Sequence, residues 1–410
     1  MPPIRSNKRW VATLNLFGFA LFPLAFNAMT WIFFVGDVLM TGRLFFVGAF
    51  AIYDRLWPRR FGTPSDAANY LPQVAVLIPA YNEEKVIDEK IRSVFESDYP
   101  LSKIKFYIGS DASTDGTDEI IRNWQQKFQQ LALVEFKGRT GKSGIINQLA
   151  EKANEEILIL TDANVIFKKD SIFNLVRHFK NQENKQVCAN IVKVSGLNAG
   201  IAVQEKTYIA IENRIKFFES LRWGAVMGAE GACYAIRRKN FAPVPPRFYM
   251  DDFYITMNVI EQGGRIVFDP EAVCYEDVPT QSSEEFKRKV RISIGNFQNL
   301  FRYKKLLFPF WKGTAFAFWS HKVLRWLTPF FLILSFLVSL ALALKFKIFT
   351  IIALLQVLGM TAPLFDKILH IKLLRYLAHF YMMNLALLKG FVVYAKGVES
   401  NVWQPTKRNV

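Results

Sequence analysis

Clusters of polar residues that could bind a charged ligand directly follow short apolar runs in the sequence, and such runs are typical of buried strands. Asp111 follows the second run, and Asp162 and Asn164 follow the fourth. In parallel α/β sheets ligands bind beyond the carboxyl ends of the strands, so these side chains are expected to converge on one crevice. Asp111 could accept hydrogen bonds from a base or ribose there. Asp162 and Asn164 could offer oxygens to a divalent cation that neutralises a diphosphate.

Each cluster taken alone can be explained as a turn or a helix cap, because Asn, Asp, Ser and Thr often serve that purpose. Capping explains Ser113 and Asp115 well. It explains Asp111 and Asp162 together less well, because both stand at the ends of strands. These two aspartates are therefore the stronger candidates for binding.

Two further clusters add opposite charges. The basic glycine-rich turn at 138–144 lacks the first glycine of a P-loop, because Phe136 stands there, but Lys142 could still approach a phosphate. Asp251 and Asp252 are adjacent, and their mutual repulsion could raise the pKa of one of them to that of a general base. A surface turn and a helix N-cap pair are the alternatives for these two clusters.

The elements that must position these residues alternate between strand and helix patterns. Strands are predicted at 74–78, 106–108, 132–136 and 157–160, and helices at 83–97, 117–131 and 253–262. Strands separated by helices predict an α/β fold with a mostly parallel sheet.

The composition indicates a chain that is partly embedded in lipid. Hydrophobic residues make up 51% of the 410 residues and charged residues only 21%. The net charge of +17 would suit nucleic acid, anionic lipid or a phosphorylated substrate, but nucleic-acid binding does not require long apolar segments. The three cysteines are widely spaced without a CxxC pair, which predicts buried thiols in a reducing compartment.

Apolar segments at both ends predict membrane helices. Residues 11–53 can hold two spans of about 20 residues, or one span and an interfacial segment. Basic flanks on both sides of this stretch favour a cytoplasmic location for both flanks. Segments 327–344 and 348–365 predict two more spans. A basic stripe on 373–393 favours an interfacial helix, with a further span as the alternative.

We therefore predict a multi-pass protein of the cell membrane with three regions. Residues 1–60 form a membrane anchor of one or two helices, and residues 61–305 form the α/β domain in the cytoplasm. Residues 306–410 contain interfacial helices, two or three spans and a basic tail.

In their order along the chain, the clusters resemble the family 2 inverting glycosyltransferases. They look most like the membrane group of cellulose, hyaluronan and poly-N-acetylglucosamine synthases. The resemblance reaches Trp403-Gln404-Pro405-Thr406-Lys407-Arg408, which is similar to a Trp-x-x-Thr-x-Arg tail in that group. It implies a Rossmann-like GT-A catalytic domain, a UDP-sugar donor and a divalent cation, either Mg²⁺ or Mn²⁺.

The resemblance also implies roles for the residues that match the family's motifs. The residues implied in nucleotide-sugar binding are Tyr81, Glu83, Asp111, Lys142 and Asp162. Asp162 begins the counterpart of an Asp-x-Asp motif that binds the metal, and Asn164 stands in place of its second Asp.

On the acceptor side, the resemblance implies a segment at 228–238 that contains Glu230 and Gly231 and ends with Arg237 and Arg238. Met250-Asp251-Asp252 stands where the family has Thr-Glu-Asp, so Asp252 is implied as the general base beside Asp251. Arg291 is the one residue kept from a Gln-x-x-Arg-Trp motif and is implied to stabilise the departing diphosphate.

The favoured function is inverting transfer of a sugar, either GlcNAc or glucose, to a glycan or lipid-linked acceptor in cell-surface polysaccharide synthesis. The expected partners are the UDP-sugar, the acceptor, membrane lipids and an export or accessory subunit, but no nucleic acid. Alternatives are a transferase that makes polyprenyl-phosphate sugars, and a transporter or scaffold with a non-catalytic domain. Asn164 and the altered segment around Arg291 motivate the last alternative.

Overall fold

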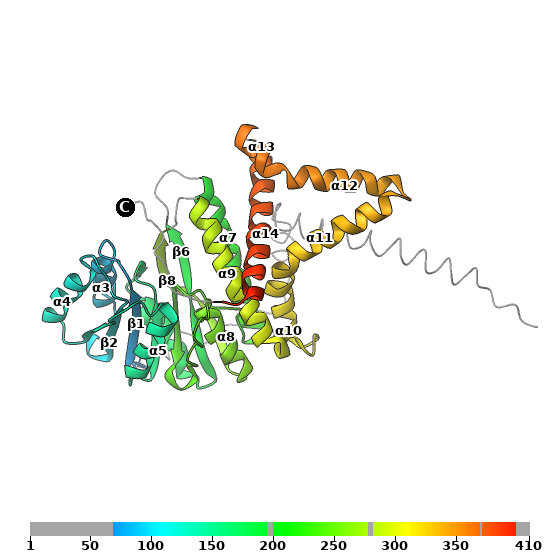
Figure 1. Ribbon diagram of the computed structural model, residues 1–410. Coiled ribbons are helices and arrows are strands. Elements are labelled where there is room, and N and C mark those ends of the chain that lie inside the picture. The colour runs from blue at the N-terminus through cyan, green and yellow to red at the C-terminus, as the bar shows by residue number, and fades with distance from the viewer. Residues whose placement is uncertain (1–68, 195–199, 278–281, 370, 399–410) are drawn as a thin grey trace, which may run out of the picture. The chain divides into compact units, whose positions relative to one another are not determined.

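A computed structural model describes residues 69–194, 200–277, 282–369 and 371–398 of the chain (Figure 1). The chain divides into two compact units, one of residues 1–57 with 324–389 and one of 58–323 with 390–410. The N-terminal spans predicted within 11–53 and the tail motif at 403–408 lie outside the described residues. The region boundaries at 60 and 305 stay predictions.

The first half of the sheet in the larger unit is parallel, as the alternation of strands and helices predicts. Its strands are β1 (Val74–Ala80), β2 (Ile104–Ser110), β3 (Leu131–Glu135) and β4 (Ile157–Thr161), and the connecting helices are α3 (Ile87–Phe95), α4 (Thr117–Lys127) and α5 (Lys142–Lys152). The strands lie in the order β3-β2-β1-β4, and each neighbouring pair is parallel. Side chains of β1 and β4 are almost fully buried because helices cover both faces of the sheet.

The helix predicted over 83–97 begins later, at Ile87. The preceding backbone serves a turn instead. The Glu83 N–H donates to the Thr117 hydroxyl at 2.8 Å, and the Glu84 N–H donates to Asp115 Oδ2 at 3.2 Å. These bonds join the turn after β1 to the turn after β2.

The second half of the sheet is mixed rather than parallel. Its strands are β7 (Cys233–Arg237), β6 (Asn184–Val194), β8 (Arg265–Asp277) and β5 (Val165–Phe167), in the order β4-β7-β6-β8-β5. β7 is antiparallel to both neighbours, β5 is antiparallel to β8, and β6 is parallel to β8. The accompanying helices are α6 (Ser171–Arg177), α7 (Gly200–Trp223), α8 (Asp251–Glu261) and α9 (Ser282–Arg302). An antiparallel β7 matters for the site, because its first residue lies beside the last residue of β4.

Burial accounts for the predicted state of the thiols. Cys188, Cys233 and Cys274 are free and buried within the sheet. Burial raises the pKa of the Cys188 thiol to about 12, so it stays protonated and unreactive at neutral pH.

Arg237 joins the two halves of the sheet at the edge opposite to the polar turns. It is buried and pairs in register with Ile157, at the start of β4. Its guanidinium donates to the Asn184 carbonyl at 3.0 Å and to Glu156 Oε1 at 2.7 Å, and it also donates to the carbonyl of Phe179. Arg237 is therefore structural, although the resemblance placed it at the end of the acceptor segment.

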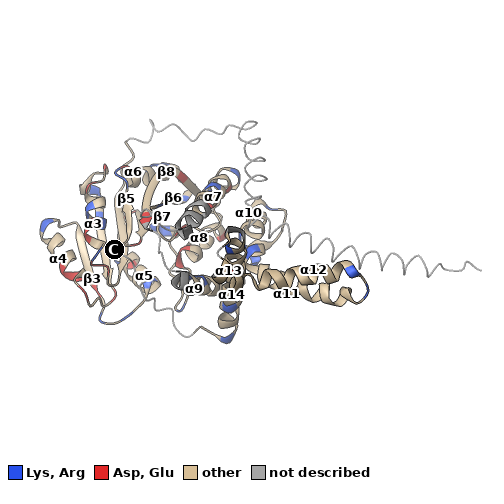
Figure 2. Cartoon of the chain, turned by 90° about the horizontal axis from the view of Figure 1, so that it is seen from above, with Lys and Arg blue, Asp and Glu red and all other residues tan. Residues whose placement is uncertain are grey.

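Helices dominate the smaller unit. α11 (Leu324–Ala343) packs against α12 (Lys347–Met360), and the Gln356 side chain donates to the Ser335 hydroxyl at 3.0 Å. The charged residues of the two helices are Arg325, near the start of α11, and Lys347, the first residue of α12, and Lys345 lies in the turn between them (Figure 2). α13 (Ala362–Leu369) and α14 (Lys372–Lys396) follow.

Among the described residues, two helices are long and apolar enough to cross a membrane, namely Gly313–Ala343 and Leu374–Lys396. The second corresponds to the segment for which a span was the alternative to an interfacial helix. The span predicted over 348–365 is interrupted, because α12 has 14 residues and ends at Met360. That length is below the roughly 20 residues that a perpendicular span requires.

Replacing Arg237 with Met is expected to lower the free energy of unfolding by at least about 2 kcal/mol, because buried carbonyls lose a charged donor. Chemical denaturation would measure the loss. The matched control is Arg238→Met, because Arg238 is the exposed neighbour and should change stability by less than about 0.5 kcal/mol. Equal stability of the two variants would contradict the structural role of Arg237.

Candidate active site

The ends of three parallel strands bring the predicted binding residues to one edge of the sheet. Tyr81 follows β1, Asp111 follows β2, and Asp162 follows β4. Because neighbouring parallel strands end at the same edge, these residues share that edge although they are far apart in the sequence.

The antiparallel strand β7 and the first residues of two helices bring the remaining predicted residues to this edge of the sheet. Thr161, the last residue of β4, lies beside Cys233, the first residue of β7, so the loop that contains Gly231 reaches the same edge. α5 begins with Lys142, and α8 begins with Asp251. The predicted acceptor and base residues thus lie near the predicted donor residues.

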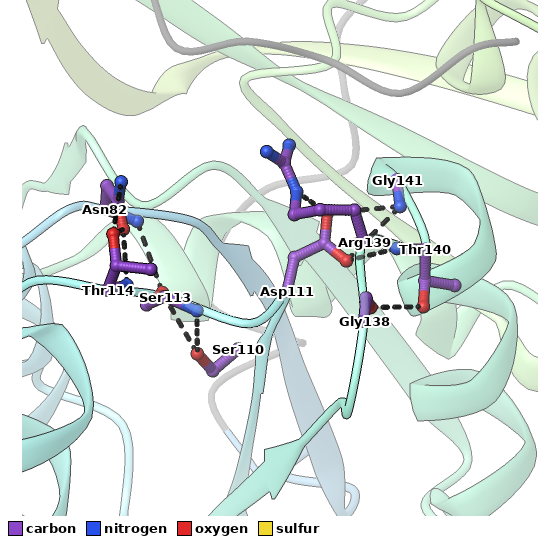
Figure 3. A network of polar contacts seen from close by, with 9 residues as sticks. All are labelled: Asn82, Ser110, Asp111, Ser113, Thr114, Gly138, Arg139, Thr140 and Gly141. Carbon is purple, nitrogen blue, oxygen red and sulfur yellow. Dashed lines mark hydrogen bonds and ion pairs between the residues drawn. The ribbon is translucent and has the colours of Figure 1, made fainter.

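Asp111 holds the glycine-rich turn against the end of β2 (Figure 3). Its carboxylate accepts hydrogen bonds from Arg139 Nε at 3.0 Å, from the Gly141 N–H at 3.1 Å and from the Thr140 N–H. The Arg139 guanidinium lies 3.3 Å from the centroid of the Tyr81 ring. An aromatic ring, a planar cation and a carboxylate therefore stand together where a nucleotide base could stack and form hydrogen bonds.

The two turns beside this group adopt a left-handed backbone at residues other than glycine. Asn82 has a φ of 53° and Ala112 a φ of 57°. The Asn82 side chain accepts a hydrogen bond from the Thr114 N–H at 2.8 Å, and the Asn82 N–H donates to the Ser113 hydroxyl at 3.2 Å. Such backbone strain persists only where surrounding contacts maintain it, and it is frequent at functional sites.

One lysine neutralises a group of carboxylates at the centre of the site. Lys142 Nζ lies 2.6 Å from Asp162 Oδ1 and 4.0 Å from Asp251 Oδ2. Burial opposes the charge of Lys142, but Asp162, Asp251 and Asp252 outweigh it and raise the pKa of the ammonium. Lys142 therefore stays charged throughout the physiological range.

Gly231 makes this close arrangement sterically feasible. A Cβ atom at position 231 would lie 2.9 Å from Asp252 Oδ2 and 3.3 Å from Lys142 Nζ. Gly228, at the start of the same loop, has a φ of 85° and faces the Phe253 ring. Both glycines are thus required by the approach of the loop to α8.

Asp252 has the protonation behaviour expected of a general base. Burial, followed by repulsion from Asp251, raises the pKa of Asp252 to about 7, against the attraction of Lys142. Burial also raises the pKa of Asp251. A carboxylate whose pKa lies near the working pH can both accept and release a proton efficiently.

The candidate metal ligands fit an ion that the substrate helps to bind. Asp162 is 31% exposed in its side chain, and Asn164 follows on the same turn. Within the described parts of the chain, no group of three or more His, Cys, Asp or Glu residues could hold a metal. Mg²⁺ is often bound by one or two protein oxygens, with phosphates and water filling the other positions, so Asp162 and Asn164 suit a diphosphate-bound cation.

The remaining predicted residues occupy the margins of the site. Glu83 is buried, and its carbonyl accepts the Ile87 N–H at 2.9 Å at the start of α3. Burial and the neighbouring Arg288 lower the pKa of Arg291, while Asp162 and Asp251 are close enough to act in the opposite direction. Arg291, on α9, therefore lies within electrostatic range of Asp162 and Asp251.

Lys90 was missed by the sequence analysis. It is fully buried, and its Nζ donates to the Thr161 hydroxyl at 3.0 Å and to the Val165 carbonyl at 2.5 Å. It thus holds both ends of the turn that carries Asp162 and Asn164. Burial lowers the pKa of Lys90 to about 8. A detectable signal was present, because Lys90 lies on the otherwise apolar face of α3.

Comparison with known proteins identifies related sequences. The family model of Glycosyl transferase family 2 matches residues 75–242. Over 236 residues the chain is 26% identical to the probable glycosyltransferase YdaM of Bacillus subtilis. The matched region covers 55% of this chain and 56% of that protein. Over 296 residues it is 24% identical to the poly-β-1,6-N-acetyl-D-glucosamine synthase of Staphylococcus epidermidis, covering 70% and 67%.

A solved structure shows the same fold over nearly the whole chain. The mannosyltransferase PcManGT of Pyrobaculum calidifontis, solved with GDP-mannose and Mn²⁺, superposes with a TM-score of 0.64 at 21% identity and covers 93% of this chain and all of that chain. The predicted GT-A fold is therefore confirmed. Residues 75–242 therefore form a glycosyltransferase family 2 domain, and the larger unit has the GT-A fold.

Proposed function

We propose that this protein transfers a sugar, GlcNAc or glucose, from a UDP-sugar to a hydroxyl group of a glycan or lipid-linked acceptor, with inversion at the anomeric carbon. The observation that carries the proposal is the Asp252 carboxylate, whose pKa burial and Asp251 raise to about 7. It lies across Gly231 from the ammonium of Lys142. A base for the acceptor thus stands beside a cation for the diphosphate.

The donor would bind along the edge of the sheet. The uracil would stack on the Tyr81 ring in place of the Arg139 guanidinium, and Asp111 would offer acceptor oxygens once its contacts with the 139–141 turn are shared with the nucleotide. Lys142 and Asp162 would lie at the diphosphate. A divalent cation held by Asp162 and Asn164 would neutralise diphosphate charge when bound.

The chemical step needs one proton transfer and one displacement. Asp252 takes the proton from the acceptor hydroxyl as its oxygen attacks the anomeric carbon, and the bond from that carbon to the diphosphate oxygen breaks. UDP leaves with the bonding electrons, and the positive charges of Lys142 and Arg291 stabilise it. Attack opposite to the leaving group inverts the configuration.

The state of Asp252 favours a hydroxyl acceptor over a polyprenyl phosphate. An alcohol must lose a proton during attack, whereas a phosphate is already anionic at neutral pH and needs no base. Asp251, Asp252 and Glu230 would also repel a second phosphate at the acceptor side. The non-catalytic alternative gains no support from the geometry, because Lys142, Asp162 and Asp252 are arranged for both halves of the reaction.

Similarity to a poly-β-1,6-N-acetyl-D-glucosamine synthase over 70% of the chain supports GlcNAc as the donor sugar and cell-surface polysaccharide synthesis as the setting. The two helices Gly313–Ala343 and Leu374–Lys396 support a location in the cell membrane, with the catalytic domain in the cytoplasm where UDP-sugars are made. An export or accessory subunit would complete secretion of a product chain.

The first test is UDP release by the protein in lipid, with Mg²⁺ or Mn²⁺, across a panel of UDP-sugars and GDP-mannose. We expect release from one UDP-sugar in the presence of an acceptor glycan, with a rate reduced about 10²–10⁴-fold in Asp252→Asn. Asp98→Asn, a change at an exposed aspartate between α3 and β2, serves as the control and should retain the wild-type rate. Full activity of Asp252→Asn would remove Asp252 as the base, and transfer to a polyprenyl phosphate alone would favour the alternative.

The pH dependence of turnover should follow the charge of Asp252. Because the deprotonated form is active, kcat at saturating donor and acceptor should fall as the pH drops below about 7. Lys142 lowers the pKa of Asp252, so Lys142→Met should move this acidic limb to higher pH. A limb that stays in place, or moves to lower pH, would contradict the electrostatic coupling of these two residues.

The proposed topology can be tested with thiol labelling, because the native cysteines are buried. A membrane-impermeant maleimide should leave the exposed variant Lys127→Cys unlabelled in intact cells and label it after lysis. The wild-type chain provides the background in both conditions. Labelling of Lys127→Cys in intact cells would show that the catalytic domain lies outside the cytoplasm.

A further inference from the structure

Three ionic side chains form part of the buried surface of α7, here called its ionic face. Glu212, Lys216 and Glu219 lie at spacings of four and three residues, which places them on one face of the helix, and all three are buried. Burying ions usually stabilises a fold no better than apolar side chains of similar size would. Stability alone therefore does not explain the ionic face.

Two side chains from the π-helical turn Phe318–Val323 pair with this face. His321 Nδ1 lies 2.7 Å from Glu219 Oε1, and His321 Nε2 lies 3.0 Å from Glu212 Oε1. Lys322 also bonds to Glu212. The carboxylates at both ends of the ionic face are thus held by a segment from elsewhere in the domain.

The ionic face holds the loop at 226–231 at two points. Glu219 Oε2 accepts a hydrogen bond from the Met227 N–H at 2.9 Å, and Lys216 Nζ lies 2.8 Å from Glu230 Oε1. From the other side, the Ala229 N–H donates to the Thr256 hydroxyl of α8 at 3.2 Å. This is the loop that contains Gly231 and approaches Asp252.

The pair also fixes the charge of Glu230. Burial opposes ionisation, but Lys216 outweighs it and lowers the pKa of the Glu230 carboxyl. The Glu230 side chain is 31% exposed, whereas that of Lys216 is 2% exposed, so the carboxylate is accessible while its counter-charge is not. A partly exposed carboxylate that is fixed by a buried ammonium group can accept a hydrogen bond from a ligand.

We propose that Lys216 is a positioning residue for sugar transfer, which holds the Glu230 carboxylate beside Asp252 so that Glu230 accepts a hydrogen bond from a second hydroxyl of the acceptor sugar. The inference deepens the proposed function and rests on it. The acceptor sugar then meets two carboxylates, one that removes the reacting proton and one that orients the ring. A bond to a fixed carboxylate selects acceptors that carry a hydroxyl at that position.

The kinetic test is a double-mutant cycle of Lys216→Met and Glu230→Gln, measured with a soluble oligosaccharide acceptor. We expect each single variant to raise the acceptor KM about tenfold while the donor KM stays unchanged. If Lys216 acts through Glu230, the double variant will be no worse than Glu230→Gln alone. Multiplicative effects in the double variant, or an equal rise in the donor KM, would overturn the proposal.

A matched control separates positioning from simple stability. Asp269 is another buried carboxylate in an ion pair, 2.8 Å from Arg177 and 2.7 Å from His178. Asp269→Asn should lower the melting temperature and leave the acceptor KM unchanged. An acceptor KM that rises as much in Asp269→Asn as in Lys216→Met would reduce the role of Lys216 to stability.

A second measurement does not depend on turnover. Hydrophobic carbodiimides modify protonated carboxyl groups, and mass spectrometry can locate the product at Glu230. Because Lys216 lowers the pKa of Glu230, Lys216→Met should increase this labelling at pH 7 by several-fold. Unchanged labelling would contradict the proposal that Lys216 keeps the Glu230 carboxylate ionised and in place. Absence of sugar transfer by the wild type, with labelling as expected, would instead count against the proposed function.

Discussion

Three carboxylates share one ammonium at the edge of the sheet, and the rest of the site is arranged around that imbalance. Lys142 contacts Asp162 directly and lies near Asp251 and Asp252. Burial, and then repulsion from Asp251, raise the pKa of Asp252 against the attraction of this one cation, which suits the proposed base. The same excess of negative charge would favour a cation at Asp162. In the proposed reaction, donor binding and acceptor activation would therefore depend on one electrostatic arrangement.

The local sequence was sufficient to predict the donor-binding part of this arrangement. Asp111 and Asp162 stand directly after apolar runs, and strand ends are local features, so their convergence followed from the predicted parallel sheet. The approach of Asp252 to Lys142 is different in kind, because the two residues are more than a hundred positions apart. Motif resemblance placed Asp252 in the site, and only the antiparallel β7 and the glycines of its loop explain how it gets there.

Residues that support the site were harder to recognise, because their role lies in burial and not in pattern. The position of Lys90 on the apolar face of α3 indicates burial but not the contacts that it makes with the turn of Asp162. No helix was predicted at α7, whose charged inner face conceals the apolar periodicity by which helices are recognised. Lys216 and Glu219 become visible only when the loop at 226–231 is seen to rest on them.

The ionic face of α7 also gives the domain an unusual response to heat. The cost of removing ions from water falls as temperature rises, whereas the stabilisation from apolar burial levels off. Glu212, Lys216 and Glu219 are such desolvated charges, and Lys322 bonds to Glu212. Warming should therefore weaken this part of the interior less than the aliphatic core between the strands and helices. The loop at 226–231 would remain ordered at temperatures at which the outer strands of the sheet begin to lose their structure.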